Sequence, residues 1–127
     1  MTEIKPDGDV ILRVAPMPAD VNMSGDIFGG WVLSQMDVAG GFLAAERAKG
    51  RVATVAIEAM KFIRPVKVGD MMCIYGDIHR VGRTSIAVSL ESWVMRGQGA
   101  ETAKVTEGIF TFVALDDNGD PRPVDNT

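Results

Sequence analysis

The sequence predicts an α+β fold in which one long central helix is wrapped by an antiparallel β-sheet of about five strands. Three observations lead to this prediction. The chain has 127 residues and a hydrophobic content of 46%, which is enough for one sizeable core. A single long apolar stretch is composed of good helix formers, and four later segments read as strands separated by turns. A helix that is apolar nearly all round needs cover on most of its surface, and a curved sheet supplies that cover.

The first elements are a short strand, a loop and the helix. The strand candidate is "DVILRVA" at residues 9–15, and "PMPADVNMSGDIFGG" at residues 16–30 is rich in loop-forming residues. The helix is expected from about Gly30 to Lys49, where "AERAKG" supplies a charged last turn and a glycine stop. Such a helix is about 28 Å long, and its composition predicts that it is mostly buried.

The remaining elements are strands, expected at residues 53–63, 71–81, 84–95 and 103–115. The turn "GRT" joins the second and third of these as an antiparallel pair, and strict alternation in the third predicts one buried face. That face carries Ile86, Val88, Leu90 and Val94. The segment "DDNGDPRPVDNT" reads as a turn and a loose tail. We therefore expect a single domain over residues 1–127, with an ordered core at about 12–116 and a loose tail at 117–127.

Composition excludes several classes of function. The formal net charge is −4, from 13 basic and 17 acidic residues, and no basic run is present, so nucleic acid is not an expected partner. The single cysteine, Cys73, cannot form an internal disulfide, and no metal-ligand spacing accompanies it. The first residues lack the pattern of a signal peptide. These features predict a cytoplasmic protein without a metal.

The most apolar segment runs from Ile27 to Ala45 and contains one charged residue, Asp37. Its length is close to that of a membrane span, but it includes four glycines and this central carboxylate. We therefore expect no membrane insertion.

Asp37 itself is open to two interpretations. An aspartate in a helix interior is unfavourable, and a buried carboxylate is costly unless it is paired or hydrogen-bonded. In one interpretation the side chain lies on a narrow exposed stripe or makes a satisfied hydrogen bond in the core. In the other it is a catalytic base or nucleophile in an apolar cleft, where desolvation makes a carboxylate more basic.

Two glycines favour the catalytic interpretation. Gly29 and Gly30 lie at the expected helix start, where free backbone N–H groups and the positive end of the helix dipole can hold a developing oxyanion. Asp37 follows Gly30 by seven residues, which places the two about 10 Å apart along the helix axis. One chain can therefore hardly bring both to one carbonyl. A symmetric dimer with antiparallel helices can, and it predicts composite active sites.

Four quoted segments together resemble a known family. They are "PADVNMSGDIFGGWVLSQMD", "RVATVAIEAMKFIRPVKVGD", "VGRTSIAV" and "GIFTFVALDDNG". The chain resembles the YciA-like acyl-CoA thioesterases of the hotdog-fold superfamily over nearly its whole length, residues 12 to 123.

The resemblance implies a hotdog fold and hydrolysis of acyl-CoA without a metal or cofactor. It also implies a homo-oligomer, at least a dimer joined sheet edge to sheet edge, and a hexamer built as a trimer of dimers. The family's catalytic carboxylate matches Asp37, its catalytic asparagine matches Asn22, and its helix-start amide matches Gly30. Close relatives often have a second asparagine where this chain has Ser24.

The implied reaction is hydrolysis of acyl-CoA thioesters, with broad short- to medium-chain specificity. The amide of Gly30 polarises the thioester carbonyl, the partner's Asp37 activates water, and Asn22 orients the water or the carbonyl. Direct attack by Asp37, which gives a mixed anhydride, is an equally allowed variant. A non-catalytic acyl-CoA-binding or sensing module on the same fold is the alternative function.

Coenzyme A carries phosphates, so cations are expected near the mouth of the cleft. The candidates are Arg64 and Lys67, which flank Pro65, and the turn residues Arg83, Thr84 and Ser85. The only histidine, His79, is expected to have a surface or structural role.

Overall fold

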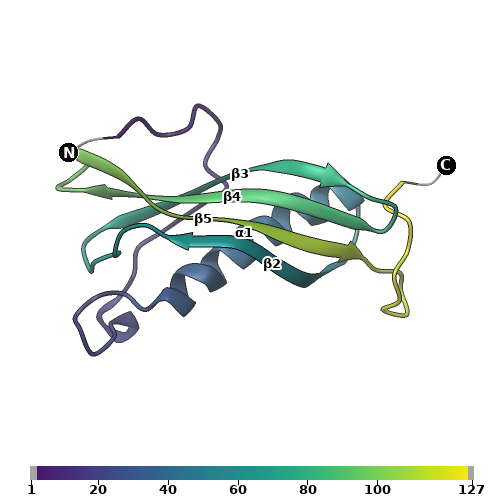
Figure 1. Ribbon diagram of the computed structural model, residues 1–127, viewed down its shortest axis with the longest axis horizontal. Helices are drawn as coiled ribbons and strands as arrows, with labels where there is room; N and C mark the ends of the chain where they lie inside the picture. Colours follow the sequence, from purple (N-terminus) through teal and green to yellow (C-terminus); the bar gives the residue numbers. More distant parts are fainter. Residues whose placement is uncertain (1–2, 126–127) are drawn as a thin grey trace.

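The computed structural model describes residues 3–125 and confirms the α+β architecture (Figure 1). Strand β1 (Leu12–Val14) and a 3₁₀ turn η1 (Pro18–Asp20) precede helix α1 (Gly29–Ala48). Four long strands follow, with the bounds β2 (Val52–Phe62), β3 (Met71–Val81), β4 (Ser85–Arg96) and β5 (Glu101–Ala114). The helix and all five expected strands are therefore present, with small shifts of their ends.

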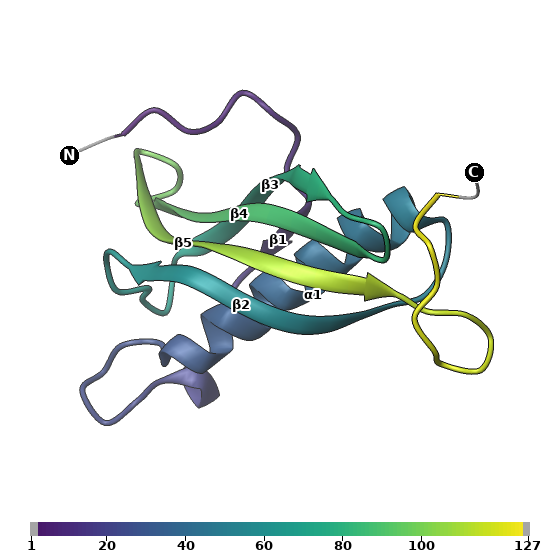
Figure 2. The ribbon, with the colours of Figure 1, turned by 45° about the vertical axis from the view of Figure 1, so that its right-hand side comes forward.

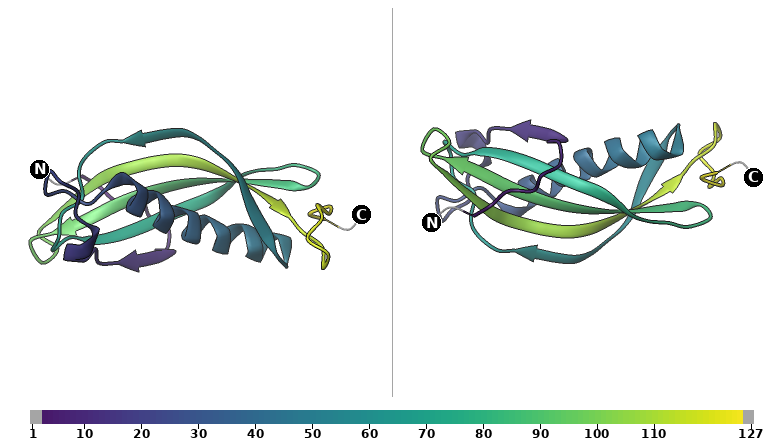
Figure 3. Two further views of the ribbon diagram at one scale, coloured as in Figure 1. Left: turned by 90° about the horizontal axis from the view of Figure 1, so that it is seen from below. Right: turned by 90° about the horizontal axis from the view of Figure 1, so that it is seen from above.

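The strands form one antiparallel sheet in the order β1-β3-β4-β5-β2. The sheet curves, and α1 lies diagonally across its concave face (Figures 2 and 3). The expected pairing across the "GRT" turn is present, because β3 and β4 run antiparallel along their length. The alternation expected in β4 is also confirmed, since Ile86, Val88 and Leu90 are fully buried against the helix side.

The helix packs through one face. Its buried residues are Val32, Met36, Ala39, Gly40, Ala44 and Ala48, most of which recur every four positions. The prediction that α1 is mostly buried is wrong for the single chain, because Val38 is 51% exposed and Phe42 is 68% exposed. The helix looks apolar on all sides in the sequence because residues such as Val38 and Phe42 are apolar too, but they lie on the side of α1 that faces away from this chain's sheet.

Strand β2 forms an open edge of the sheet. It is hydrogen-bonded to β5 on one side, with register shifts between Thr54 and Ala56 and between Glu58 and Lys61. Most of its residues are exposed, including Val55 at 57% and Ile57 at 38%. An exposed apolar edge strand of 11 residues is a ready surface for another chain, because its free N–H and C=O groups need partners.

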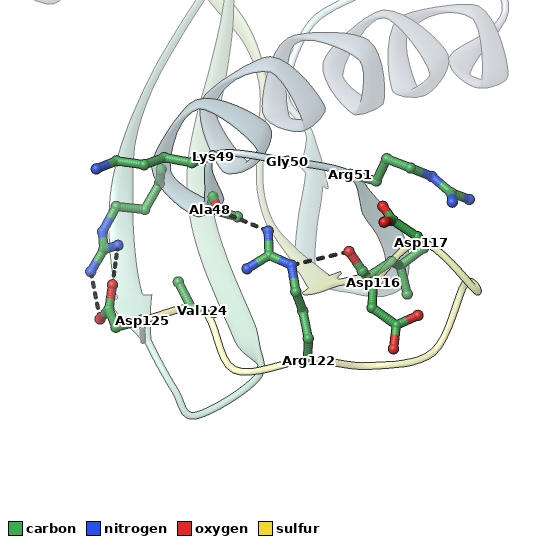
Figure 4. A pocket seen from close by; sticks show the side chains of 11 residues that line it. Ala48, Lys49, Gly50, Arg51, Asp116, Asp117, Arg122, Val124 and Asp125 are labelled. Atoms are coloured by element: carbon green, nitrogen blue, oxygen red, sulfur yellow. Dashed lines mark hydrogen bonds and ion pairs between the residues drawn. The ribbon is translucent and has the colours of Figure 1, made fainter. Parts of the chain in front are cut away.

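The C-terminal segment is packed up to Asp125, which differs from the loose tail that the sequence predicts. Val124 is buried, and its N–H donates to the carbonyl of Arg83 at 2.8 Å. Arg47 forms an ion pair with Asp125 at 2.8 Å (Figure 4). The Arg122 guanidinium donates to the carbonyls of Ala48 at 2.8 Å and Leu115 at 3.1 Å. Arginine therefore caps the C-terminal end of α1 and fastens the segment to it.

We predict that Arg122→Ala lowers the free energy of unfolding by about 1–3 kcal/mol, because the carbonyls of Ala48 and Leu115 lose their donor. Thermal or urea unfolding measures the change. Arg51→Ala is the matched control, since Arg51 is an exposed arginine beside the same segment and has no side-chain hydrogen bond within residues 3–125. Equal losses in the two variants would refute the capping role.

Candidate active site

The loop before α1 is closed by Asn22. Its side-chain oxygen accepts hydrogen bonds from the N–H groups of Ser24 at 2.9 Å and Asp26 at 3.1 Å, and its own N–H donates to the carbonyl of Asp26 at 2.7 Å. This arrangement is an Asx-type turn. Asn22 is exposed, and its side-chain NH₂ group makes no hydrogen bond to any part of the chain that the structure describes. The side-chain oxygen of Asn22 thus stabilises the loop, and its NH₂ group is free to donate hydrogen bonds.

The helix start presents free backbone amides. Phe28 occupies the N-cap position without a side-chain hydrogen bond, and the first bond within the turn runs from Trp31 N–H to the Phe28 carbonyl. The amides of Gly29 and Gly30 are exposed and find no acceptor among residues 3–125. Two unpaired N–H groups at the positive end of a 20-residue helix form a site that can stabilise negative charge.

A pocket of about 320 Å³ lies beside this helix start. Its lining includes Asn22, Gly29, Val32, Phe62, Arg64 and Thr106. A Cβ atom at Gly29 would lie 3.1 Å from the Phe62 ring, so glycine allows the ring to lie against the helix start. The pocket is mainly apolar, with polar groups at its mouth and in its wall, which is the usual composition of a small-molecule site.

Asp37 lies almost two turns along α1 from this pocket and does not line it. The side chain is half-buried, and one of its carboxylate oxygens accepts a hydrogen bond from the Thr54 hydroxyl of β2 at 2.6 Å. The structure therefore separates Asp37 from Gly30 within one chain, as expected from the helical rise. It places the carboxylate on the side of the helix that faces the open edge strand.

The cationic candidates are also separated. Arg64 is at the helix-start end, where its guanidinium donates to the Lys104 carbonyl at 2.7 Å and pairs with Glu3 at 2.6 Å. The Lys67 ammonium pairs with Asp26. These two cations therefore already have partners in the chain.

The turn at residues 82–84 is at the opposite end of the molecule, near the C-terminal end of α1 (Figure 1). Backbone carbonyls of Arg83 and Thr84 accept bonds from Val124 and Ala114. Ser85 begins β4. The Arg83 side chain is exposed and makes no bond within the described chain. The three turn residues thus do not meet Arg64 or Lys67 in one chain.

Asp70 and Arg96 form an ion pair that holds the loop next to the pocket, and the sequence did not predict it. The Asp70 side chain is 2% exposed and receives both Arg96 Nε and Nη2 at 2.7 Å. It also accepts the Lys67 backbone N–H at 2.8 Å, so it holds the loop that precedes β3. That loop supplies the Val66 carbonyl, which accepts the Ile27 N–H at 2.9 Å just before the helix start. The hydrogen bond to Asp70 raises the pKa of Arg96 above its usual value.

No sequence signal points to this pair, because Asp70 lies in the loop before β3 and Arg96 lies at the end of β4, and only the pairing of β3 with β4 brings them together. The Thr54 bond to Asp37 also escaped prediction, because it depends on how α1 packs beside β2.

A larger cavity of about 740 Å³ lies at the C-terminal end of α1 (Figure 4). It is lined by charged residues such as Arg47, Arg122 and Asp125, which satisfy one another or cap the helix. None of the predicted site residues lines it. Within residues 3–125 no group of three or more His, Cys, Asp and Glu side chains can hold a metal ion, and no helix there is long and apolar enough to cross a membrane.

Comparison with known proteins gives consistent matches. The model of the thioesterase superfamily matches residues 24–101. An uncharacterized acyl-CoA thioester hydrolase of Haemophilus influenzae is 50% identical over 92% of this chain and 78% of its own length. The acyl-CoA thioester hydrolase YciA of Escherichia coli is 48% identical over 92% of this chain and 91% of its own.

Solved structures agree with these sequence matches. The hexameric thioesterase y2039 from Yersinia pestis is 46% identical with a TM-score of 0.90, over 97% of this chain and 100% of that one. HI0827, a hexameric broad specificity acyl-coenzyme A thioesterase, has a TM-score of 0.89 at 46% identity over 99% and 89% of the two chains. Cj0915 of Campylobacter jejuni, a hexameric hotdog fold thioesterase, has a TM-score of 0.88 at 37% identity over 93% and 91%.

We predict that Arg96→Ala lowers the free energy of unfolding by about 2–3 kcal/mol, because it leaves the Asp70 carboxylate buried without its partner. Lys104→Ala is the control, since Lys104 pairs with Glu91 and Glu107 at the longer distance of 3.4 Å, and such pairs contribute at most about 1 kcal/mol. Urea unfolding at one protein concentration compares the two variants. A loss in Arg96→Ala no larger than in the control would contradict this role of Asp70.

Proposed function

Because the chain belongs to the thioesterase superfamily, we propose that it is an acyl-CoA thioesterase that hydrolyses a broad set of short- to medium-chain acyl-CoA thioesters to free acid and coenzyme A. The family and the hotdog fold predicted from the sequence are both confirmed by the matches. The observation that carries the proposal is the pair of exposed, unpaired amides of Gly29 and Gly30 beside an apolar pocket. Relatives named as hydrolases favour an enzyme over the non-catalytic binding module.

In the proposed mechanism the thioester carbonyl lies at the helix start and accepts a hydrogen bond from the Gly30 amide. The partner's Asp37 takes a proton from a water molecule as the water oxygen bonds to the carbonyl carbon. The Gly30 amide and the helix dipole stabilise the oxyanion that forms. The C–S bond then breaks, coenzyme A leaves as a thiolate, and the thiolate takes up a proton. The free NH₂ group of Asn22 orients the water or the carbonyl.

Attack by Asp37 itself remains an alternative first step, with a mixed anhydride that water then hydrolyses. The Thr54 hydrogen bond to one carboxylate oxygen supports either role, because it fixes the orientation of the carboxylate while the other oxygen stays free.

A dimer is needed for this mechanism, and two exposed features support one. The edge strand β2 presents unpaired backbone groups together with exposed Val55 and Ile57. Val38, one residue beyond Asp37, is exposed on the same helix. A twofold axis beside β2 joins two sheets edge to edge and sets the two helices antiparallel. Each Asp37 then lies near the helix start of the other subunit. Solved relatives are hexameric, and we propose a trimer of such dimers for this chain.

The same axis explains the scattered cations. The helix start and the β3–β4 turn are at opposite ends of one chain, so an antiparallel partner brings its own turn towards the helix start. Arg83, Thr84 and Ser85 of one subunit and Arg64 and Lys67 of the other then surround one cleft mouth, where they bind the phosphates of coenzyme A. The cytoplasmic location expected from the single cysteine stays a prediction, and no cofactor is proposed.

We predict that Asp37→Ala and Asp37→Asn each lower kcat by at least about a hundredfold, because the base or nucleophile is lost. Thiol release from acyl-CoAs of increasing length, acetyl to palmitoyl, measures the activity. Glu46→Gln removes an exposed carboxylate from the same helix and is expected to leave kcat unchanged. Full activity in both Asp37 variants would show that another group does the chemistry.

Composite sites make a separate prediction. Asn22→Ala and Asp37→Ala remove groups that one site draws from different subunits, so a dimer of one variant with the other keeps one intact site. Unfolding and refolding the two inactive variants together is expected to restore about a quarter of wild-type activity, since half of the dimers are mixed and each has one site. If the mixture stays as inactive as the separate variants, the site is within one chain.

A further inference from the structure

One row of residues crosses the helix-facing side of the sheet below the start of α1. The strand registers pair Ile74 with Ser92, Ser92 with Thr106, and Thr106 with Phe62. The row therefore runs from β3 through β4 and β5 to the open edge at β2. Its outer member, Phe62, and the next member, Thr106, both line the pocket beside the helix start.

The two central members of this row are buried hydroxyl residues. Ser92 is 0% exposed and Thr106 is 1% exposed. The Ser92 hydroxyl is buried and has no hydrogen-bond partner among residues 3–125. The Thr106 hydroxyl makes no hydrogen bond to these residues either, but its oxygen is not one of the buried unsatisfied atoms, and Thr106 lines the pocket. A buried hydroxyl without a partner costs about 1–3 kcal/mol. Alanine would fill the place of Ser92 without that cost, so the chain's own packing does not account for the Ser92 hydroxyl.

Both hydroxyl residues lie close to the proposed reaction centre, where they can contribute to substrate recognition. Thr106 lines the same pocket as Gly29, whose neighbour Gly30 is proposed to hold the thioester carbonyl. Val32, Val66 and Phe62 supply much of the remaining wall, so an acyl group that enters meets apolar side chains and the hydroxyl of Thr106, with Ser92 on the next strand behind it.

We propose that Ser92 and Thr106 are specificity-determining residues that recognise a hydroxyl oxygen on the acyl group. This inference rests on the proposed thioesterase function and adds a substrate class to it, short hydroxyacyl-CoA thioesters. A hydroxyl on the substrate both donates and accepts, as do the serine and threonine hydroxyls, so it can bond to Thr106 in the pocket lining while Thr106 bonds to Ser92 on the next strand.

A carboxylate on the acyl group is disfavoured, because the row offers no cation to pair with it. The pocket's arginine, Arg64, is proposed to bind the phosphates of coenzyme A at the mouth of the cleft, and a buried unpaired charge is costly.

The experiment compares kcat/KM for butyryl-CoA with that for 3-hydroxybutyryl-CoA and 4-hydroxybutyryl-CoA. The variants are Ser92→Ala and Thr106→Val, which remove the hydroxyls with little change of shape. Ser89→Ala is the matched control, because Ser89 is on the same strand but alternates onto the opposite face of the sheet. We expect the wild type to prefer at least one hydroxyacyl substrate by about tenfold or more, and each hydroxyl-removing variant to lose about tenfold of that preference.

Activity on butyryl-CoA is expected to stay within about threefold of wild type in both variants. The midpoint of thermal unfolding is expected to be unchanged or higher in Ser92→Ala, because this substitution removes a buried group without a partner, and unchanged in Thr106→Val.

The possible results separate the two proposals. Turnover without a preference in the wild type, or equal losses on both kinds of substrate in the variants, overturns the specificity role and leaves the thioesterase function intact. An unchanged preference with a lower unfolding midpoint shows that the hydroxyls bind an ordered water and also overturns it. Absence of turnover on every acyl-CoA overturns the thioesterase function itself.

Discussion

Gly40 lies where α1 crosses the middle of the sheet, and a Cβ atom there would lie 2.9 Å from Leu90 and 3.0 Å from Phe112. Only glycine allows this close approach, because both contacts are with fully or nearly fully buried side chains that have no room to move. The contact fixes the rotation of the helix. Positions 32, 36, 40, 44 and 48 all turn towards the sheet. Each further residue advances about 100° around the axis. Asp37, one residue past Met36, therefore points to the side towards β2, and Val38 points away from the sheet.

This rotation divides the chemistry between two surfaces. The helix start lies over the row that contains Thr106 and Phe62, where it opens into the pocket. The carboxylate of Asp37 meets Thr54 on the edge strand instead. The protomer thus has a helix start with unpaired amides and a separate carboxylate, and its open edge and exposed helix residues lie next to the carboxylate. In the proposed mechanism assembly and catalysis are coupled, since the exposed apolar surface that a second subunit would bury also carries Asp37, which the pocket of the same chain lacks.

The sequence predicted the parts of the fold that depend on local periodicity. Alternation along residues 86–90 identified the buried face of β4, and continuous helix-forming composition identified α1. The sequence overestimated how much of α1 its own sheet buries, because an apolar residue such as Phe42 gives the same sequence signal whether this chain or a second one buries it. The packing of Val124 and the Asp70–Arg96 pair also escaped prediction, since both depend on contacts between residues far apart in the chain. The catalytic roles of Asn22, Gly30 and Asp37 stay a prediction, whereas the separation of Gly30 from Asp37 along the helix followed from the sequence spacing alone.

Polar groups without partners indicate which cavity is the binding site better than cavity volume does. The larger cavity at the end of α1 is lined by arginines and aspartates, but Arg122 caps the helix and Arg47 pairs with Asp125, so that end needs no ligand to satisfy it. Four groups in or next to the smaller pocket's lining make no hydrogen bond to residues 3–125, namely the amides of Gly29 and Gly30 and the hydroxyls of Ser92 and Thr106. The buried Ser92 hydroxyl costs stability in the isolated chain, and all four groups are of a kind that an oxygen-bearing substrate satisfies. A fold selected for stability alone has no reason to gather such groups around one pocket, and a fold selected to bind an oxygen-bearing substrate there does.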